Sequence, residues 1–180
     1  MKYFVDTEFI ERGSKHPLEL ISVAAVAEDG REFYAISTEF KASHANEFVR
    51  EYVLPHVDFR GEELDVFSGG SPRRIREAAR RMPRSQIASE LKKFVGESPE
   101  FWGDYVAYDW VAICQLFGDM SDLPEGWPMF CRDLQQLRAE RGSPELPPAP
   151  NPAGIVHHAL YDARETAYQY RWLIQEEGHD

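Results

Sequence analysis

The sequence is poor in cysteine, in long apolar runs and in positive charge. Two cysteines, Cys114 and Cys131, among 180 residues exclude the disulfide frameworks that stabilise small secreted domains. No apolar run reaches the roughly 18 residues that a membrane-spanning helix needs. The first apolar run stops after three residues, so the sequence predicts no signal peptide. These absences favour a cytoplasmic protein without a membrane partner.

Positive charge is scarce because 20 Lys and Arg face 31 Asp and Glu, a formal net charge of −11. A protein that binds nucleic acid through its whole surface normally has the opposite sign. Carboxylates that hold divalent metal ions add negative charge of their own, so a nucleic-acid enzyme is compatible with this balance.

Apolar residues are plentiful, with 43% hydrophobic and 13% aromatic side chains. This composition supports a substantial core and excludes a disordered or collagen-like chain. The length suits one domain, residues 1–180.

Hydrophobic periodicity predicts an α/β domain with a mixed sheet. Strands are expected at 3–5, 18–27 and 32–40, with an Asp-Gly turn between the last two. Further short strands are expected near 101–107 and 130–131. Helical spacing begins near 48–53 and predicts helices over 83–95, 110–117, 133–141 and 158–176. The last helix should bury Leu160, Ala163, Ala167, Tyr170 and Ile174.

The first candidate site is Asp6-Thr7-Glu8, at the end of the first strand. Residues i and i+2 of an extended segment face the same side, so both carboxylates can bind one ion. The pattern is weak by itself in a chain with 31 acids, and the alternative is a solvated turn.

Asp109 is the second candidate, because it lies where a helix is expected to begin. The alternative for Asp109 is a structural N-cap, a common role for aspartate. His157 and Asp162 are the third, five residues apart near the last helix. An acid on the apolar side of that helix needs a partner or a metal ion. His158 is the rival to His157, and its alternative is a surface residue near the helix start.

In this order, Asp-x-Glu, a middle Asp and His-x4-Asp resemble the DEDDh group of 3′–5′ exonucleases, which have a ribonuclease H-like fold. Within this group, three segments are most similar to a small actinobacterial type of 3′–5′ exoribonuclease, polyadenylate-specific exoribonuclease AS. They are Asp-Thr-Glu-Phe-Ile-Glu, Ala-Tyr-Asp-Trp-Val-Ala-Ile-Cys-Gln-Leu and His-x-Ala-Leu-x-Asp-Ala-Arg. The resemblance covers almost the whole chain. The chain differs from many relatives at two places. After Glu8 it has Phe9-Ile10-Glu11, where many relatives have Thr-Thr-Gly or Met-Thr-Gly. Four residues before Asp109 it has Tyr105, where many relatives have Asn.

The resemblance implies that Asp6, Glu8, Asp109 and Asp162 bind two Mg²⁺ or Mn²⁺ ions and that His157 is the general base. Two such ions can hold the attacking and leaving oxygens of a phosphodiester and lower the pKa of a bound water. Carboxylates suit these ions, whereas zinc would require a Cys/His cluster that the sequence lacks. Histidine, with an ordinary pKa of about 6.5, is mostly neutral at cellular pH, as a general base must be.

The substrate implied by the resemblance is the 3′ end of single-stranded RNA, released as nucleoside monophosphates, with adenylate favoured. Relatives are often homodimers. Glu8 and His157 are expected at the terminal nucleotide, and five aromatic residues beside the motifs could stack on bases, with core packing as the alternative for each. They are Phe9, Trp102, Tyr105, Tyr108 and Trp110, of which Phe9, Tyr108 and Trp110 are the predicted substrate contacts. Six arginines at 73–84 could hold phosphates or form a solvated helix face.

Three other functions fit parts of the sequence. The first is a catalytically inactive RNA-binding module of the same fold, and the second is a DNA 3′–5′ exonuclease. The third is a phosphatase with Asp6 as nucleophile, which Glu8 fits poorly because that chemistry usually needs Asp-x-Asp.

Overall fold

The computed structural model describes residues 1–57, 80–151 and 153–175. Within these residues, one sheet has the strand order β4-β3-β2-β1-β5-β6. The strands β1 to β3 pair antiparallel, whereas β4, β5 and β6 each join a neighbour in parallel. The predicted mixed sheet, antiparallel first and parallel later, is confirmed. The bounds are β1 Lys2–Ile10, β2 Glu19–Ala27, β3 Glu32–Ser37, β4 Arg80–Met82, β5 Glu100–Gly103 and β6 Arg132–Asp133.

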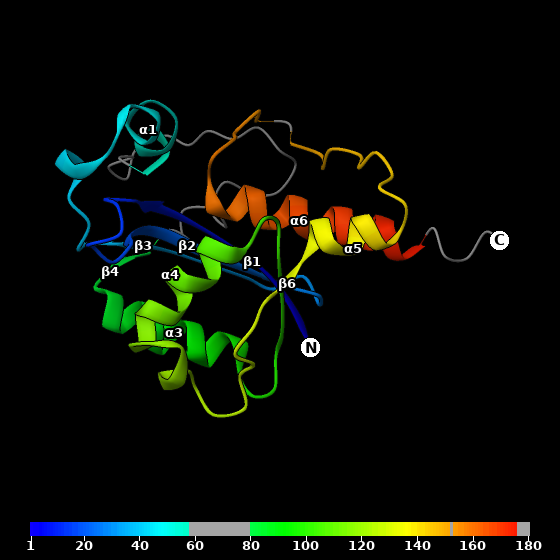
Figure 1. The fold of residues 1–180 in the computed structure, drawn as a ribbon, viewed down its shortest axis with the longest axis horizontal. Helices are drawn as coiled ribbons and strands as arrows, with labels where there is room; N and C mark the ends of the chain where they lie inside the picture. The colour runs from blue at the N-terminus through cyan, green and yellow to red at the C-terminus, as the bar shows by residue number, and fades with distance from the viewer. Residues whose placement is uncertain (58–79, 152, 176–180) are drawn as a thin grey trace.

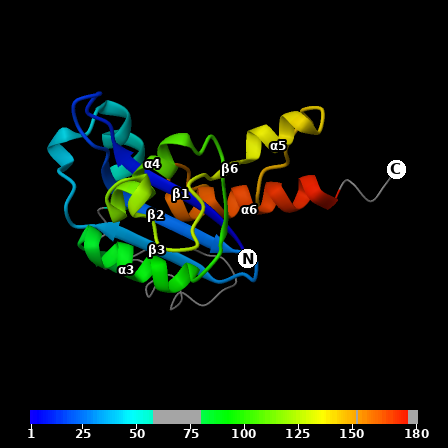
Figure 2. The same cartoon turned by 60° about the horizontal axis from the view of Figure 1, so that its bottom comes forward.

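Helices cover both faces of the sheet. The helices α3 and α4 lie on one face (Figure 1), and Figure 2 shows α6 on the other. In the chain, the shorter helices η1, η2 and α1 follow β3, η3 follows α4, and α5 follows β6. The bounds are η1 Ala42–His44, η2 Val49–Val53, α1 Leu54–Val57, α3 Arg84–Val95, α4 Ala107–Phe117, η3 Met120–Asp122, α5 Leu134–Glu140 and α6 Ala159–Gln175.

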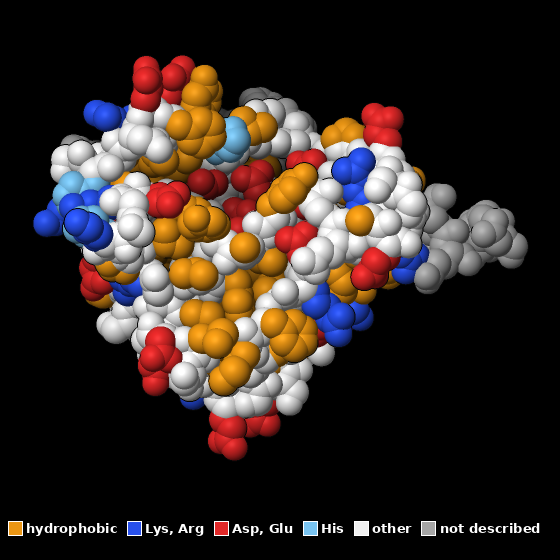
Figure 3. All heavy atoms as spheres, viewed as in Figure 1, with side chains coloured by type: hydrophobic (Ala, Val, Ile, Leu, Met, Phe, Trp, Pro, Cys, Tyr) orange, Lys and Arg blue, Asp and Glu red, His pale blue; other side chains and the backbone are white. Residues whose placement is uncertain are grey.

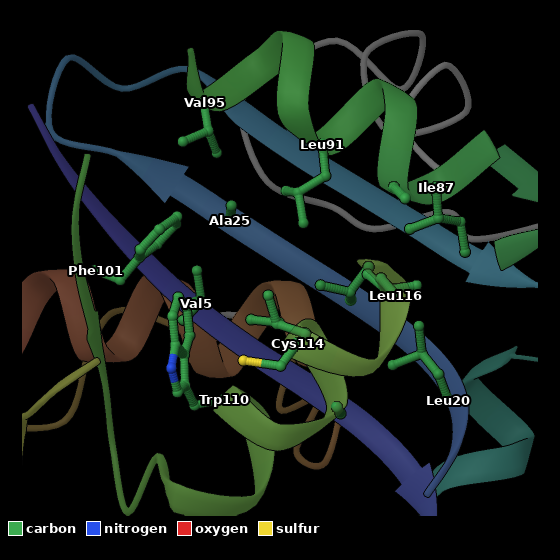
Figure 4. Packing of buried hydrophobic residues seen from close by; sticks show 14 of the residues in the cluster. Val5, Leu20, Ala25, Ile87, Leu91, Val95, Phe101, Trp110, Cys114 and Leu116 are labelled. Atoms are coloured by element: carbon green, nitrogen blue, oxygen red, sulfur yellow. The ribbon is translucent and has the colours of Figure 1, made fainter. Parts of the chain in front are cut away.

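Side-chain alternation along β1 divides the core into two clusters. Tyr3 and Val5 point toward α3 and α4, whereas Phe4 and Ile10 point toward α6. Figure 4 shows the first cluster, in which side chains of α3 and α4 meet those of β1 and β2. Because β1 is central and buried on both faces, its polar residues lie next to one cluster or the other.

Several strand boundaries differ from those predicted from the sequence. The strand β1 does not end at Asp6 but continues to Ile10, so the acidic pair lies inside a strand. Residues 105–107 are not a strand, because Tyr105 turns the chain with a φ of 48° and α4 begins at Ala107. The sixth strand lies two residues later than predicted, and β4 falls in the arginine run, where no strand was predicted.

The helix predictions are mostly confirmed. Asp133 caps α5 by accepting hydrogen bonds from the backbone N–H groups of Gln135 and Gln136. The last helix buries Leu173 in place of Ile174, which is 40% exposed. The predicted apolar face was wrong at this position because the buried stripe continues from Tyr170 by three residues rather than four.

Candidate active site

The strand β1 places Asp6 and Glu8 on one face of the sheet. Both follow the alternation of Phe4 and Ile10, so they face α6. The pairing register with β2 shifts between Glu8 and Phe9, a bulge-like irregularity beside the acidic pair. The two carboxylates therefore share a side of the strand, as the i, i+2 spacing predicted.

Asp162 completes a group of three carboxylates. It lies in the first turn of α6, and its Oδ2 accepts a hydrogen bond from the backbone N–H of His158 at 3.0 Å. One oxygen each from Asp6, Glu8 and Asp162 lies within 4.8 Å of the others. Such a set of oxygen donors fits a hard divalent cation. The structure thus brings together three of the four predicted metal ligands.

Asp109 lies beside this group, on α4. It is not the N-cap of that helix, because α4 begins at Ala107 and Val106 is the capping residue. Its Oδ1 instead accepts two hydrogen bonds from Thr7, one from the backbone N–H at 2.9 Å and one from the hydroxyl at 2.6 Å. Asp109 also lines the same pocket as the three carboxylates. The capping alternative for this residue was therefore wrong.

Burial raises the pKa of all four carboxylates, and neighbouring acids of the same group raise the pKa values of Asp6 and Glu8 further. Burial, followed by the neighbouring acids Asp162 and Asp109, raises the pKa of Glu8 to about 8. Burial also raises the pKa of Asp109 and of Asp162 to about 6 and, with Asp109 next, holds the pKa of Asp6 well above its ordinary value. A site that disfavours its own negative charge favours a bound cation. The donor set and its electrostatics both fit divalent metal ions.

His157 and His158 occupy different environments. His157 lines the acidic pocket, with a φ of 57°, and its ring meets Phe48 and Tyr52 edge-on at centroid distances of 4.9 and 5.9 Å. His158 is only 7% exposed and stacks on Tyr34 at 4.6 Å. Its burial lowers the pKa of its imidazole to about 4. The alternative of a surface residue at His158 was wrong.

The pocket has a volume of about 380 Å³. Figure 3 shows acidic side chains at the floor of a hollow, with hydrophobic side chains and a histidine around it. Besides the predicted acids, Phe9, Tyr105 and Tyr108 line it. The hollow therefore combines an acidic floor with an aromatic wall.

The five aromatic candidates divide into two groups. Phe9 and Tyr108 stack on each other, with centroids 6.0 Å apart and an angle of 11° between the rings, and Tyr105 is 74% exposed. Trp102 and Trp110 are buried. The Trp110 ring packs on Phe101 and its Nε1 donates to the carbonyl of Met129, so it is a core residue. The prediction of Trp110 as a substrate contact is corrected accordingly.

Sequence reasoning missed Thr7 and Asp104. Thr7 is the middle residue of the first motif, and its hydrogen bonds to Asp109 depend on tertiary contact across 102 residues. Asp104 also lines the pocket and accepts a hydrogen bond from Nε2 of Gln135 at 2.7 Å. Burial raises its pKa. The sequence could have pointed to Asp104 had the turn before α4 been recognised.

The arginine run is only partly described. Arg73, Arg74 and Arg76 lie outside the described residues. Arg80 and Arg81 are exposed, and Arg81 donates to the carbonyl of Val57. Arg84 donates to the carbonyls of Leu18 and Gln115, which gives it a structural role.

Among the described helices, none is long and apolar enough to cross a bilayer.

The fold and the residues of the pocket together indicate the class of protein. The chain is an α/β protein with a mixed sheet, and its central strand and flanking helices bring carboxylates and a histidine to one pocket. No family model matches the chain. Two proteins of Mycobacterium tuberculosis, from strains CDC 1551 and H37Rv, are each named a 3′–5′ exoribonuclease. Each is 43% identical to this chain over 177 residues. The match covers 96% of this chain and 93% of each relative. The chain belongs to this family of 3′–5′ exoribonucleases.

Solved structures support the predicted fold. Exonuclease I from Methylocaldum szegediense aligns with a TM-score of 0.54 and 17% identity, over 97% of this chain and 40% of that one. A chain in the structure of the yeast NOT1 MIF4G domain co-crystallized with CAF1 aligns with a TM-score of 0.51 and 12% identity, over 99% of this chain and 81% of that one. The protein spans less than half of the exonuclease I chain. These likenesses confirm the ribonuclease H-like fold.

Proposed function

We propose that this protein is a metal-dependent 3′–5′ exoribonuclease that releases nucleoside monophosphates from the 3′ ends of single-stranded RNA. The observation that carries the proposal is the convergence of Asp6, Glu8 and Asp162 within 4.8 Å, in a pocket that Asp109 and His157 also line. Membership of the 3′–5′ exoribonuclease family supports the same reaction.

The four carboxylates would hold two Mg²⁺ ions, or Mn²⁺ in their place, and the cations would offset the repulsion that raises the pKa values of Asp6 and Glu8. Divalent cations at such a site lower the pKa of a bound water and stabilise charge on the phosphate. His157 would take the proton from the attacking water, since it is the histidine that lines the pocket. The neighbouring His158 is buried and has no access to it.

The terminal nucleotide would lie against the aromatic wall. Phe9 follows Glu8 directly and stacks on Tyr108, and both rings line the pocket. A base could stack on this pair, and adenine would be favoured because larger bases stack more strongly. Glu8 and the backbone near Phe9 would receive the ribose, whose 2′-hydroxyl distinguishes RNA from DNA.

We also propose that the enzyme is cytoplasmic, that it forms a homodimer and that residues 1–180 fold as one domain. Both described cysteines are free, in keeping with a reducing compartment. Sedimentation velocity of the full chain at several concentrations would measure the oligomeric state.

The test is a time course on 5′-labelled single-stranded RNA and DNA of one sequence, with Mg²⁺, Mn²⁺ or EDTA. We expect a ladder that shortens from the 3′ end one nucleotide at a time, mononucleotide products, faster cleavage of RNA and no cleavage in EDTA. RNA binding without cleavage would instead identify an inactive module. Equal or faster cleavage of DNA would identify a DNA exonuclease, and a phospho-aspartyl intermediate would identify a phosphatase.

A further inference from the structure

Thr7 lies between two predicted metal ligands, yet its side chain is on the other face of β1. It is 5% exposed and contacts Asp109, which is 8% exposed. Its backbone N–H and its hydroxyl donate to the same oxygen, Oδ1, at 2.9 and 2.6 Å. Hydrogen bonds from O–H groups to carboxylates are short and strong when the acceptor is ionised, and the 2.6 Å separation lies in that range.

Two donors on one oxygen fix the rotation of the carboxylate. With Oδ1 held by β1, Asp109 can turn only Oδ2 toward the pocket that it lines with Asp6, Glu8 and Asp162. Asp109 lies outside the group of three whose oxygens are within 4.8 Å, so its orientation decides whether it can serve the same cations. A ligand that is already oriented loses less conformational entropy on binding.

We propose that Thr7 is a positioning residue, which holds Oδ1 of Asp109 and thereby aims Oδ2 at the cations. The inference rests on the proposed function, since it takes Asp109 to be a cation ligand. It assigns the hydroxyl a role that the backbone N–H does not replace, because a single donor leaves the carboxylate free to rotate. Partners that orient metal ligands typically contribute about 10- to 100-fold to metal affinity or activity.

The test compares Thr7→Val, which keeps the shape but removes the hydroxyl, with Thr7→Ser, which keeps the hydroxyl. Calorimetric titration of the metal-free full chain with Mn²⁺ measures affinity without turnover. We expect Thr7→Val to weaken Mn²⁺ binding about 10-fold or more and to raise the Mg²⁺ concentration for half-maximal cleavage in parallel. We expect Thr7→Ser to stay near wild type, and the KM for RNA at saturating Mg²⁺ to change less than 2-fold in both.

The same pair is then measured in the Asp109→Asn background. If Thr7 acts through Asp109, Thr7→Val should weaken Mn²⁺ binding no further there. Thermal unfolding in EDTA identifies a variant that fails to fold, in which case Thr7→Ala replaces Thr7→Val as the form without a hydroxyl.

Two results would overturn the proposal. One is unchanged Mn²⁺ affinity in Thr7→Val with a lowered melting temperature, which describes a structural residue. The other is an equal loss of Mn²⁺ affinity with and without Asp109. Neither affects the proposed function, which fails separately if the wild-type chain binds no Mn²⁺ or cleaves no RNA.

Discussion

The backbone N–H of His158 donates a hydrogen bond to Oδ2 of Asp162 at 3.0 Å. This contact ties a pocket carboxylate to the start of α6. The two adjacent histidines lie in different environments, with His158 buried against Tyr34 and His157 lining the acidic pocket. The roles of the two side chains can therefore be separated by mutation.

If His157 is the general base, as proposed above, replacing it by Ala should lower kcat about 10²- to 10⁴-fold, because the attacking water loses its proton acceptor. Mn²⁺ affinity and the melting temperature should stay close to wild type, since His157 is only partly buried and its contacts are ring edges. Single-turnover cleavage, calorimetry and thermal unfolding measure the three quantities.

His158→Ala is the matched control, and its effect should fall on stability. The ring is buried and stacked, so its removal should lower the unfolding free energy by about 1–3 kcal/mol, while kcat below the melting transition changes little. A large loss of kcat in a stable His158→Ala, with an active His157→Ala, would reverse the assignment of the base.

Asp6→Asn should abolish turnover and leave the metal-free protein as stable as wild type or more stable. Asp6 is half-buried beside Asp109, Asp162 and Glu8, and removing one of these like charges relieves repulsion. The measurements are cleavage of labelled RNA and melting temperature in EDTA. Glu97→Gln, at an exposed acid of the loop after α3, should change neither. Retention of more than about a tenth of wild-type activity in Asp6→Asn would argue against the two-metal site.

The stability of the metal-free protein should fall as pH rises. The pKa of Glu8 is about 8 in the folded chain, against an ordinary 4.5, so the folded state binds more protons between these values and loses stability as pH rises through them. The pKa of His158, lowered to about 4, acts in the opposite direction up to its ordinary 6.5. Above pH 6.5, where His158 no longer opposes it, the titration of Glu8 should lower the stability up to about pH 8, and the raised pKa of Asp6 acts in the same direction.

In EDTA over this window, the melting temperature should fall by about 2–4 °C, which corresponds to on the order of 1 kcal/mol. Glu8→Gln should remove much of the fall, because glutamine does not titrate. Mn²⁺ should stabilise the wild type more at pH 8 than at pH 6.5, since the cation competes with protons. A melting temperature that rises between pH 6.5 and 8, or an identical slope in Glu8→Gln, would contradict the raised pKa of Glu8.

Much of this fold could be predicted because its signals are local. The nearly continuous apolar run of β2, the Asp-Gly turn before β3 and the cap at Asp133 all depend on neighbouring residues. Boundaries failed where tertiary packing decides. The strand β1 continues past Asp6 because β2 pairs with it up to Ile10, a partner that the acidic residues of β1 do not reveal.

The site was predictable to the extent that its chemistry needs particular residue types at particular spacings. Asp6, Glu8 and Asp162 converge as their pattern indicated. The partner of Asp109 was not predictable, since a threonine in a strand carries no signal of a contact 102 residues away. Trp110 was misplaced because adjacency to Asp109 in the sequence does not determine which side of α4 a residue faces: Tyr108 lines the pocket, whereas the Trp110 ring packs on Phe101 in the core.

The stacked pair of Phe9 and Tyr108 should set base preference. If the terminal base stacks on Phe9, then Phe9→Ala should lower kcat/KM on oligo(A) by about 5- to 150-fold, the equivalent of roughly 1–3 kcal/mol of stacking. The loss on oligo(U) should be smaller, because uracil offers less area, so the A-to-U ratio should fall toward one. Trp110→Phe is a control, since that ring is buried and should alter stability without altering the ratio. Measurements on oligo(A), oligo(U) and oligo(dA) of equal length also test the ribose, and faster cleavage of oligo(A) than oligo(dA) is expected in both wild type and Phe9→Ala. An unchanged A-to-U ratio in Phe9→Ala would remove Phe9 from the base site, even with every metal ligand intact.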